Sequence, residues 1–144
     1  MNGAGWSISG SLPAFGEDSV LFQAATGTGI GRYFNDPLSA TGLALRQDQS
    51  VETVRTSGAT LYYQRAWAPD WLTVVGASVL RVGDEGARPA EALQRAVYAS
   101  VNLIHRLTAL AIVGAELLWG EAKRVNGDSA SNARVQLSLR YLIF

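Results

Sequence analysis

Charged and polar side chains near the C-terminus recur at every second position. Between residues 134 and 141, arginine, glutamine and serine alternate with valine, leucine and tyrosine. An extended strand points successive side chains to opposite faces, so the polar groups would share one face. Arginine rings favour anions and Asp or Glu rings favour cations, because a partly desolvated ion needs a compensating charge. Arg134 and Arg140 therefore either line an anion-preferring path through water, or are solvated or paired with Glu116.

Other segments that alternate in the same way carry further polar groups. The side chains that we expect to face the water-filled side are Gln23, Tyr98, Ser100, Asn102, Glu116, Arg134, Gln136, Ser138 and Arg140. We expect the uncharged members of this set to form hydrogen bonds with water rather than to form a specific binding site.

The remaining candidates for chemistry have simpler structural explanations. His105 is the single histidine and has no partner at metal-ligand spacing, so a metal site is not expected. No serine has a plausible histidine partner for nucleophilic catalysis. Gly27, Gly29 and Gly31 lack the dinucleotide-binding spacing, and alternating glycines in a strand leave room for a close neighbour or a bend. We therefore expect no enzymatic activity and no cofactor.

The composition favours a β protein and gives no support to a nucleic-acid-binding, a disulfide-rich or a helical membrane protein. The chain has 144 residues, of which 17% are charged, and it contains 15 glycines, which suits a β protein with many turns. Twelve basic and twelve acidic residues cancel, so nucleic acid is not an expected partner. Cysteine is absent, and nothing points to a disulfide scaffold. No stretch reaches the roughly 20 apolar residues of a transmembrane helix.

Period-two alternation is the dominant pattern along the whole chain. It predicts strands over 4–12, 18–34, 57–68, 71–82, 93–105, 109–123 and 132–144, with a short hairpin of 43–46 against 51–54 inside one loop. Short connections at 13–18, 68–70 and 106–108 alternate with longer polar ones at 35–54, 83–92 and 124–131. Outer-membrane barrels combine short periplasmic turns with long extracellular loops in this way.

Aromatic residues lie at or near the ends of the expected strands. They are Trp6, Tyr33, Phe34, Trp67, Trp71, Trp119, Tyr141 and Phe144. Aromatic belts mark the two interfaces of a membrane. A soluble β-sandwich with an aromatic core is the alternative, but the apolar face is rich in Ala and Val, which suits contact with lipid. We predict an all-β fold, an antiparallel up-and-down transmembrane β-barrel.

The number of expected strands bears on whether the chain forms a whole barrel or a segment of one. Bacterial single-chain barrels close with an even number of strands, from eight upward, whereas about seven are expected here. The first residues also lack the basic start and apolar stretch of a signal peptide. Both observations favour a segment of a larger barrel. The alternative is one strand missed in 35–56, which would give a small eight-stranded barrel.

Several of these segments, taken in order, resemble the C-terminal portion of the DcaP-like family of outer-membrane porins. The matching segments are 5–11, 22–23, 27–33, 63–67, 102–103, 114–116 and 134–141. Arg65 stands where the family pattern has histidine, and the chain ends one residue later than a Tyr-x-Phe ending. The resemblance implies a barrel of about sixteen strands, to which residues 1–144 would contribute one C-terminal membrane-spanning segment.

The same resemblance implies a function and a location. It implies a homotrimer in the bacterial outer membrane, in contact with lipid and lipopolysaccharide, that allows passive diffusion of small hydrophilic, often anionic, solutes. Two other functions remain open. One is a small eight-stranded barrel with a structural or adhesive role, and the other is a soluble β-barrel that binds an apolar ligand.

Overall fold

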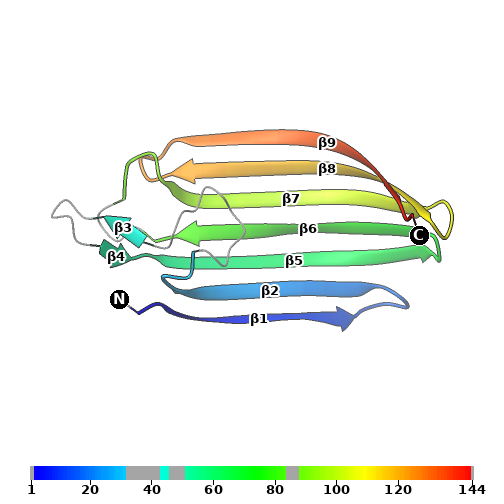
Figure 1. Ribbon diagram of the computed structural model, residues 1–144, viewed down its shortest axis with the longest axis horizontal. Coiled ribbons are helices and arrows are strands. Elements are labelled where there is room, and N and C mark those ends of the chain that lie inside the picture. Colours follow the sequence, from blue (N-terminus) through cyan, green and yellow to red (C-terminus); the bar gives the residue numbers. More distant parts are fainter. Residues whose placement is uncertain (1, 32–42, 46–50, 84–87, 144) are drawn as a thin grey trace.

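A computed structural model describes residues 2–31, 43–45, 51–83 and 88–143. Within these ranges the strands are β1 (Ala4–Pro13), β2 (Ser19–Thr28), β3 (Leu43–Leu45), β4 (Val51–Thr53), β5 (Arg55–Ala68), β6 (Trp71–Val82), β7 (Leu93–Arg106), β8 (Ala111–Arg124) and β9 (Ser129–Tyr141). Seven of them form one antiparallel sheet in the order β1-β2-β5-β6-β7-β8-β9, as Figure 1 shows. In the described part of the chain, no helix is long and apolar enough to cross a membrane.

The sheet is an open meander in which β1 and β9 are the two edges. The predicted hairpin in the long loop is present, because β3 and β4 pair with each other in a separate two-stranded sheet. Each has three residues, whereas a strand needs roughly 9–11 to cross a bilayer. The described strands therefore do not close the small eight-stranded barrel that was the alternative, and the predicted all-β antiparallel sheet is confirmed.

The two ends of the sheet differ in their connections. One end, here called the turn end, carries the short connections 14–18, 69–70 and 107–110. The opposite end, here called the loop end, carries 29–54, 83–92 and 125–128. The first strand starts at the loop end, and β9 finishes at the turn end (Figure 1).

Most predicted strand limits are confirmed to within three residues, but β2 ends earlier than expected. The prediction extended this strand to residue 34, whereas the ladder stops at Thr28. Gly29 has a φ of 71°, a left-handed conformation that interrupts an extended strand, and its N–H donates to the carbonyl of Val54 at 3.0 Å. Gly27 fulfils the structural role expected of it, since a Cβ there would lie 2.4 Å from the Cα of Gly5 on β1.

The last connection is a tight turn, so the prediction of a longer loop over 124–131 was wrong. The side chain of Asn126 accepts a hydrogen bond from the backbone N–H of Asp128 at 2.9 Å and donates to its carboxylate at 2.7 Å. Gly127 supplies a φ of 91°. These contacts reverse the chain at once, and Ser129 already pairs with Lys123 in the ladder.

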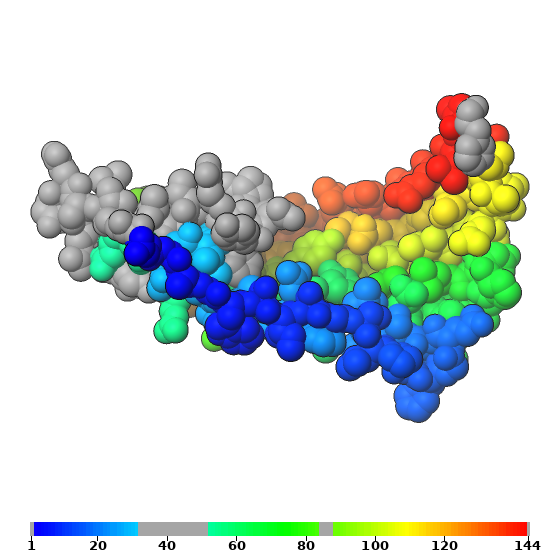
Figure 2. Space-filling view, turned by 60° about the horizontal axis from the view of Figure 1, so that its bottom comes forward, coloured from blue at the N-terminus to red at the C-terminus, as the bar shows by residue number. Residues whose placement is uncertain are grey.

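The sheet is curved, and its two faces differ in exposure. Val101 and Leu117 are 42% and 50% exposed, whereas Ser100 and Leu118, their neighbours along the strands, are each 7% exposed. Side chains crowd on the inside of a curved sheet and spread apart on the outside. Figure 2 shows the hollow between the edges β1 and β9. Paired residues share a face, so the register assigns every strand residue to the convex or the concave face.

The convex face is apolar. Apart from Leu21, every large hydrophobic side chain that the described strands leave exposed lies on it. These are Trp6, Ile8, Leu12, Leu61, Trp67, Trp71, Val75, Val101, Leu103, Leu117, Trp119, Val135, Leu137, Leu139 and Tyr141. A contiguous apolar surface of this extent is unusual on a monomer in water and is typical of a surface covered by lipid or protein.

The aromatic residues occupy several levels of this face. Trp67, Trp71 and Tyr141 lie at the turn end, and Trp6 lies near the loop end. Trp119 lies five residues inside the end of β8. Tyr33, Phe34 and Phe144 fall outside the described residues.

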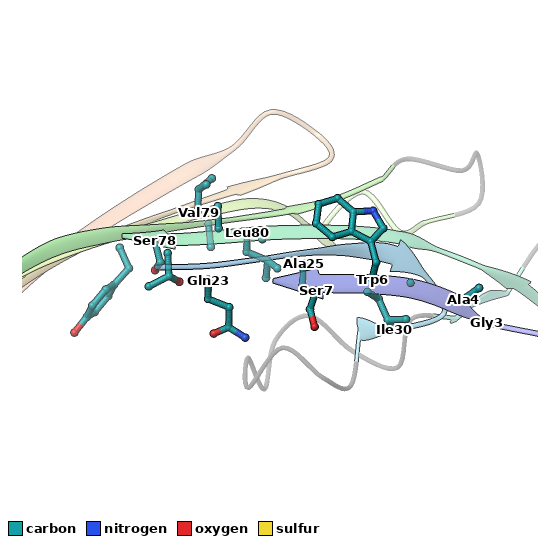
Figure 3. A pocket seen from close by; sticks show the side chains of 16 residues that line it. Gly3, Ala4, Trp6, Ser7, Gln23, Ala25, Ile30, Ser78, Val79 and Leu80 are labelled. Atoms are coloured by element: carbon teal, nitrogen blue, oxygen red, sulfur yellow. The ribbon is translucent and has the colours of Figure 1, made fainter. Parts of the chain in front are cut away.

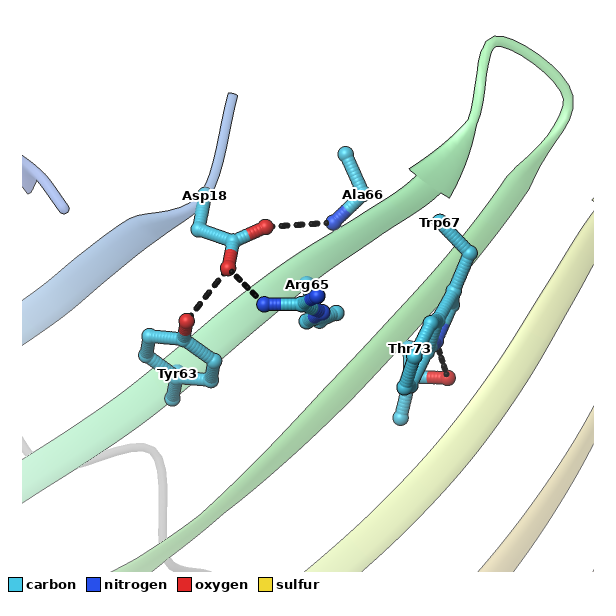
Figure 4. A network of polar contacts seen from close by, with 6 residues as sticks. All are labelled: Asp18, Tyr63, Arg65, Ala66, Trp67 and Thr73. Atoms are coloured by element: carbon cyan, nitrogen blue, oxygen red, sulfur yellow. Dashed lines mark hydrogen bonds and ion pairs between the residues drawn. The ribbon is translucent and has the colours of Figure 1, made fainter. Parts of the chain in front are cut away.

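A buried carboxylate fastens the first hairpin to β5 at the turn end (Figure 4). Asp18 is 4% exposed and accepts hydrogen bonds from the Tyr63 hydroxyl, from Arg65 Nη1 at 2.9 Å and from the Ala66 N–H at 2.9 Å. The Arg65 guanidinium also lies 4.8 Å from the centre of the Trp67 ring. These contacts hold the Arg65 side chain between the Asp18 carboxylate and the Trp67 ring.

We predict that Asp18→Asn lowers the free energy of unfolding at neutral pH but not in strong acid. The Tyr63 hydrogen bond lowers the pKa of Asp18, as do the Ala66 N–H and Arg65, against desolvation, which raises it. The stabilisation is therefore complete above the ordinary pKa of 3.8 and is lost as the pH falls through the lower pKa of the folded state. Urea unfolding in vesicles between pH 7 and pH 2 measures the gap between the two proteins. A gap that stayed constant would contradict this role.

Candidate functional site

The concave face carries a continuous band of small polar groups. One row of directly paired residues, here called the polar row, crosses all seven strands of the sheet. Its members are Ser9, Gln23, Thr60, Ser78, Tyr98, Gly120 and Asn132. Gly120 is the single member without a polar side chain. The alternation of each strand puts these groups on one face, and the lengths of the turns bring them to the same level.

The structure places all nine predicted water-facing residues on this concave face. Gln23 and Tyr98 belong to the polar row. The others lie closer to the turn end, and they are Ser100, Asn102, Glu116, Arg134, Gln136, Ser138 and Arg140. Asn102, Glu116 and Gln136 stand directly opposite one another on β7, β8 and β9. The other polar members of the row were not predicted, because their place in it depends on the pairing register; they are Ser9, Thr60, Ser78 and Asn132.

The polar row lines part of a hollow of about 890 Å³. Ser7, Gln23, Thr60, Ser78 and Tyr98 contribute polar groups to its wall. In Figure 3, Ser7 and Gln23 point to one side of the sheet, whereas Trp6 and Val79 point to the other. The wall of the hollow is therefore mixed: polar side chains share it with Leu80 and Ile30, whereas Trp6 and Val79 turn away from it.

The charged groups of the concave face carry an excess of positive charge. Among the described residues of the seven-stranded sheet, the cations of this face are Arg106, Arg124, Arg134 and Arg140, and Glu116 is the one carboxylate. Glu116 pairs with Gln136 in the ladder, two residues from Arg134 and four from Arg140. Neither arginine forms an ion pair with Glu116 in the described structure, and both are exposed. The geometry thus corresponds to solvated arginines rather than to a closed charge pair.

Apolar clusters flank the polar band at both ends of the concave face. At the loop end, Val54, Leu80, Val82 and Leu93 form a small buried core. At the turn end, Leu72 pairs with Ile104, and Ile112 occupies the next strand. Apolar side chains therefore also lie near both ends of this face, where Ile112 pairs with Arg106 and Arg140, and the strand alternation alone did not reveal them.

The described residues show no candidate metal centre. They contain no group of three or more His, Cys, Asp or Glu residues that could hold a metal ion. The ring of His105 lies on the convex face and stacks on Trp71, with ring centres 4.0 Å apart, and its Nδ1 is 3.1 Å from the carbonyl of Asp70. This imidazole therefore has a structural environment on the opposite side of the sheet from the polar row.

Comparison with solved structures supports the barrel fold. The chain is similar to the outer membrane channel DcaP of Acinetobacter baumannii, with a TM-score of 0.80 and 16% sequence identity. The match covers 96% of this chain and 40% of that channel. No family model matches the chain, and no curated protein matches its sequence. The likeness shows that the seven-stranded sheet has the fold of a segment of a porin barrel, as the resemblance in sequence implied.

Proposed function

We propose that the chain forms part of the wall of an outer-membrane porin, through which small hydrophilic solutes diffuse passively with a preference for anions. One observation carries this proposal: the polar row spans all seven strands on the concave face, while the exposed hydrophobic side chains cover the convex face. A barrel with lipid outside and water inside needs this division. A soluble barrel for an apolar ligand would need an apolar concave face, whereas here polar groups cross the middle of that face and apolar residues such as Leu21 and Leu118 are interspersed among them.

Passive diffusion agrees with the chemistry of the polar row. Its hydroxyl and amide groups form weak, exchangeable hydrogen bonds that replace part of a solute's hydration without holding the solute. No deep, specific cluster of ligands is present on the described concave face. The four arginines of this face, with one carboxylate, favour anions at the wall.

The connections suggest an orientation in the membrane. Barrels of this class place long loops outside the cell and short turns in the periplasm, so we assign the loop end to the extracellular side. The proposed location is the bacterial outer membrane. A homotrimer is also proposed, on the resemblance in sequence alone.

Conductance measurements test the proposed function. The porin of which this chain forms part of the wall, purified as a whole and inserted in planar bilayers, is expected to give discrete conductance steps. Under a potassium chloride gradient, its reversal potential should indicate preferred passage of chloride. A well-folded preparation that inserts but gives no steps would contradict a channel and favour a structural barrel.

A further inference from the structure

A row of three cations crosses the convex face at the loop end. Arg81 on β6 pairs directly with Arg95 on β7, and Arg95 pairs with Lys123 on β8. All three side chains are exposed on a face whose exposed surface is mostly apolar. We call these three residues the cation row.

The cation row lacks a compensating negative charge in the described structure. Like charges directly opposite each other on neighbouring strands destabilise a sheet. Glu121 is the carboxylate nearest in register, two residues before Lys123 on the same face and opposite Val97. Across the described residues, neither Glu121 nor any other acid forms an ion pair with the cation row. An anion at this position would therefore relieve a repulsion that no described residue balances.

A shallow hollow adjoins the row and supplies space for such an anion. Its volume is about 350 Å³, and Arg55, Ser57, Arg81 and Arg95 contribute to its lining. Guanidinium groups and a serine hydroxyl are donors that suit phosphate oxygens. Three adjacent strands span about 10 Å, since neighbouring strands lie about 4.8 Å apart. The row therefore suits a headgroup with more than one phosphate better than a single small anion.

An apolar surface continues from the cation row toward the turn end. Val79 and Val97 pair immediately below Arg81 and Arg95, and Glu121 on β8 is the one charged residue of the described sheet at that level. The surface then continues with Val75, Ala77, Ala99, Val101, Leu117 and Trp119. The arrangement of charge above and hydrocarbon below matches the two halves of a lipid molecule.

The distance of the cation row from the turn end also agrees with a position at the level of the lipid headgroups. Ten residues of β7 separate Arg95 from His105, which stacks on Trp71 at the turn end. Ten residues rise about 34 Å along a strand, and a tilt of roughly 40° leaves about 26 Å across the membrane. The apolar band of outer-membrane barrels is about 25 Å tall. If the aromatic pair marks one interface, the cation row lies at the other.

We infer that Arg81, Arg95 and Lys123 bind the phosphates of lipid A, the lipid anchor of lipopolysaccharide, at the extracellular rim of the barrel. The acyl chains would then cover Val79, Val97 and the apolar surface below them. This inference rests on the proposed function for the orientation of the barrel. It adds a lipid site on the outside of the wall, separate from the path for solutes on the inside.

Binding of purified lipid A tests the inference. Native mass spectrometry of the protein in mild detergent measures binding of diphosphoryl lipid A to wild type and to the triple variant Arg81→Gln, Arg95→Gln, Lys123→Gln. The triple variant should bind roughly 100-fold more weakly, because each cation near a lipid surface contributes about a factor of five. The matched control Arg106→Gln, Arg134→Gln, Arg140→Gln removes the same charge from the concave face and should retain lipid A binding.

Three further binding measurements define the chemistry of the site. The variant Arg81→Lys, Arg95→Lys keeps the charge and should retain most of the binding, which shows that the chain folds with altered side chains in the row. Binding should weaken as salt is raised, and inorganic phosphate at the same concentration should not displace lipid A. Equal binding by wild type and the triple glutamine variant, an equal loss in the concave control, or displacement by equimolar inorganic phosphate would overturn the inference.

Failure of this inference and failure of the proposed function give different results. If the protein conducts but the triple glutamine variant binds lipid A like wild type, the proposed lipid site is wrong and the proposed porin function is unaffected. If lipid A binding depends on the cation row but the wild type gives no conductance, the barrel is a lipid-embedded structure without a channel.

Discussion

Val101→Arg is expected to destabilise the protein in a bilayer by roughly 2–4 kcal/mol, the cost of arginine near the midplane on the lipid side of a barrel. Val101 is 42% exposed on the convex face of β7 and stands between Val75 and Leu117 on the neighbouring strands. An arginine at this site would have apolar neighbours on the adjacent strands, because the nearest carboxylate of this face toward the loop end, Glu121, lies four residues beyond Leu117 along β8.

The adjacent residue provides a matched control. Asn102 has the opposite orientation, and Glu116 is its partner on β8. Asn102→Arg introduces the same side chain on the wet face beside a carboxylate, and we expect a change of less than about 1 kcal/mol. Urea unfolding in phosphatidylcholine vesicles measures both variants. Equal costs, or a larger cost for Asn102→Arg, would show that the two faces have been assigned to the wrong environments.

Arg134→Glu combined with Arg140→Glu is expected to convert anion preference into cation preference. The concave face of the described sheet would then hold two arginines and three carboxylates in place of four arginines and one carboxylate. We expect the chloride-to-potassium permeability ratio to fall by roughly tenfold at low salt and by less at high salt, where the fixed charges are screened. Reversal potentials in planar bilayers measure this ratio.

A charge change on the other face controls for nonspecific effects. Ser129→Glu with Ser131→Glu adds two negative charges to the convex face of β9, and Arg134→Gln with Arg140→Gln removes two positive charges from its concave face. The net charge changes equally, but only the second pair should lower the permeability ratio. If both pairs shifted the ratio to the same extent, the arginines would not line the path of the ions.

The parts of the fold that depend on local alternation could be predicted from the sequence. Residues 134–141 alternate without an exception, and both the position of β9 and the shared face of Arg134 and Arg140 followed directly. Ile112 and Leu118 break the alternation of β8, because the concave face also contains apolar clusters near its ends and crowded positions where polar groups are not needed. A simple rule of polar inside and apolar outside could not anticipate them.

The parts that depend on pairing between distant segments could not be predicted in the same way. Thr60 and Ser78 join Gln23 in the polar row only through the register of three strands, which the turns set. The cation row brings Arg81, Arg95 and Lys123 together for the same reason, although nothing in the local sequence links them. The early end of β2 depended on the backbone of Gly29, whose residue type alone permits either an extended or a left-handed conformation.

The most direct test of the whole account is the environment of successive side chains along β9. Cysteine is absent from the chain, so single substitutions from Arg134→Cys to Arg140→Cys allow a spin label at each position in bilayers. Collisions with oxygen, which dissolves in lipid, should peak at 135, 137 and 139, and collisions with a water-soluble nickel complex should peak at 134, 136, 138 and 140. A profile with the opposite phase, or with no period of two, would show that the apolar side of the sheet does not face the membrane.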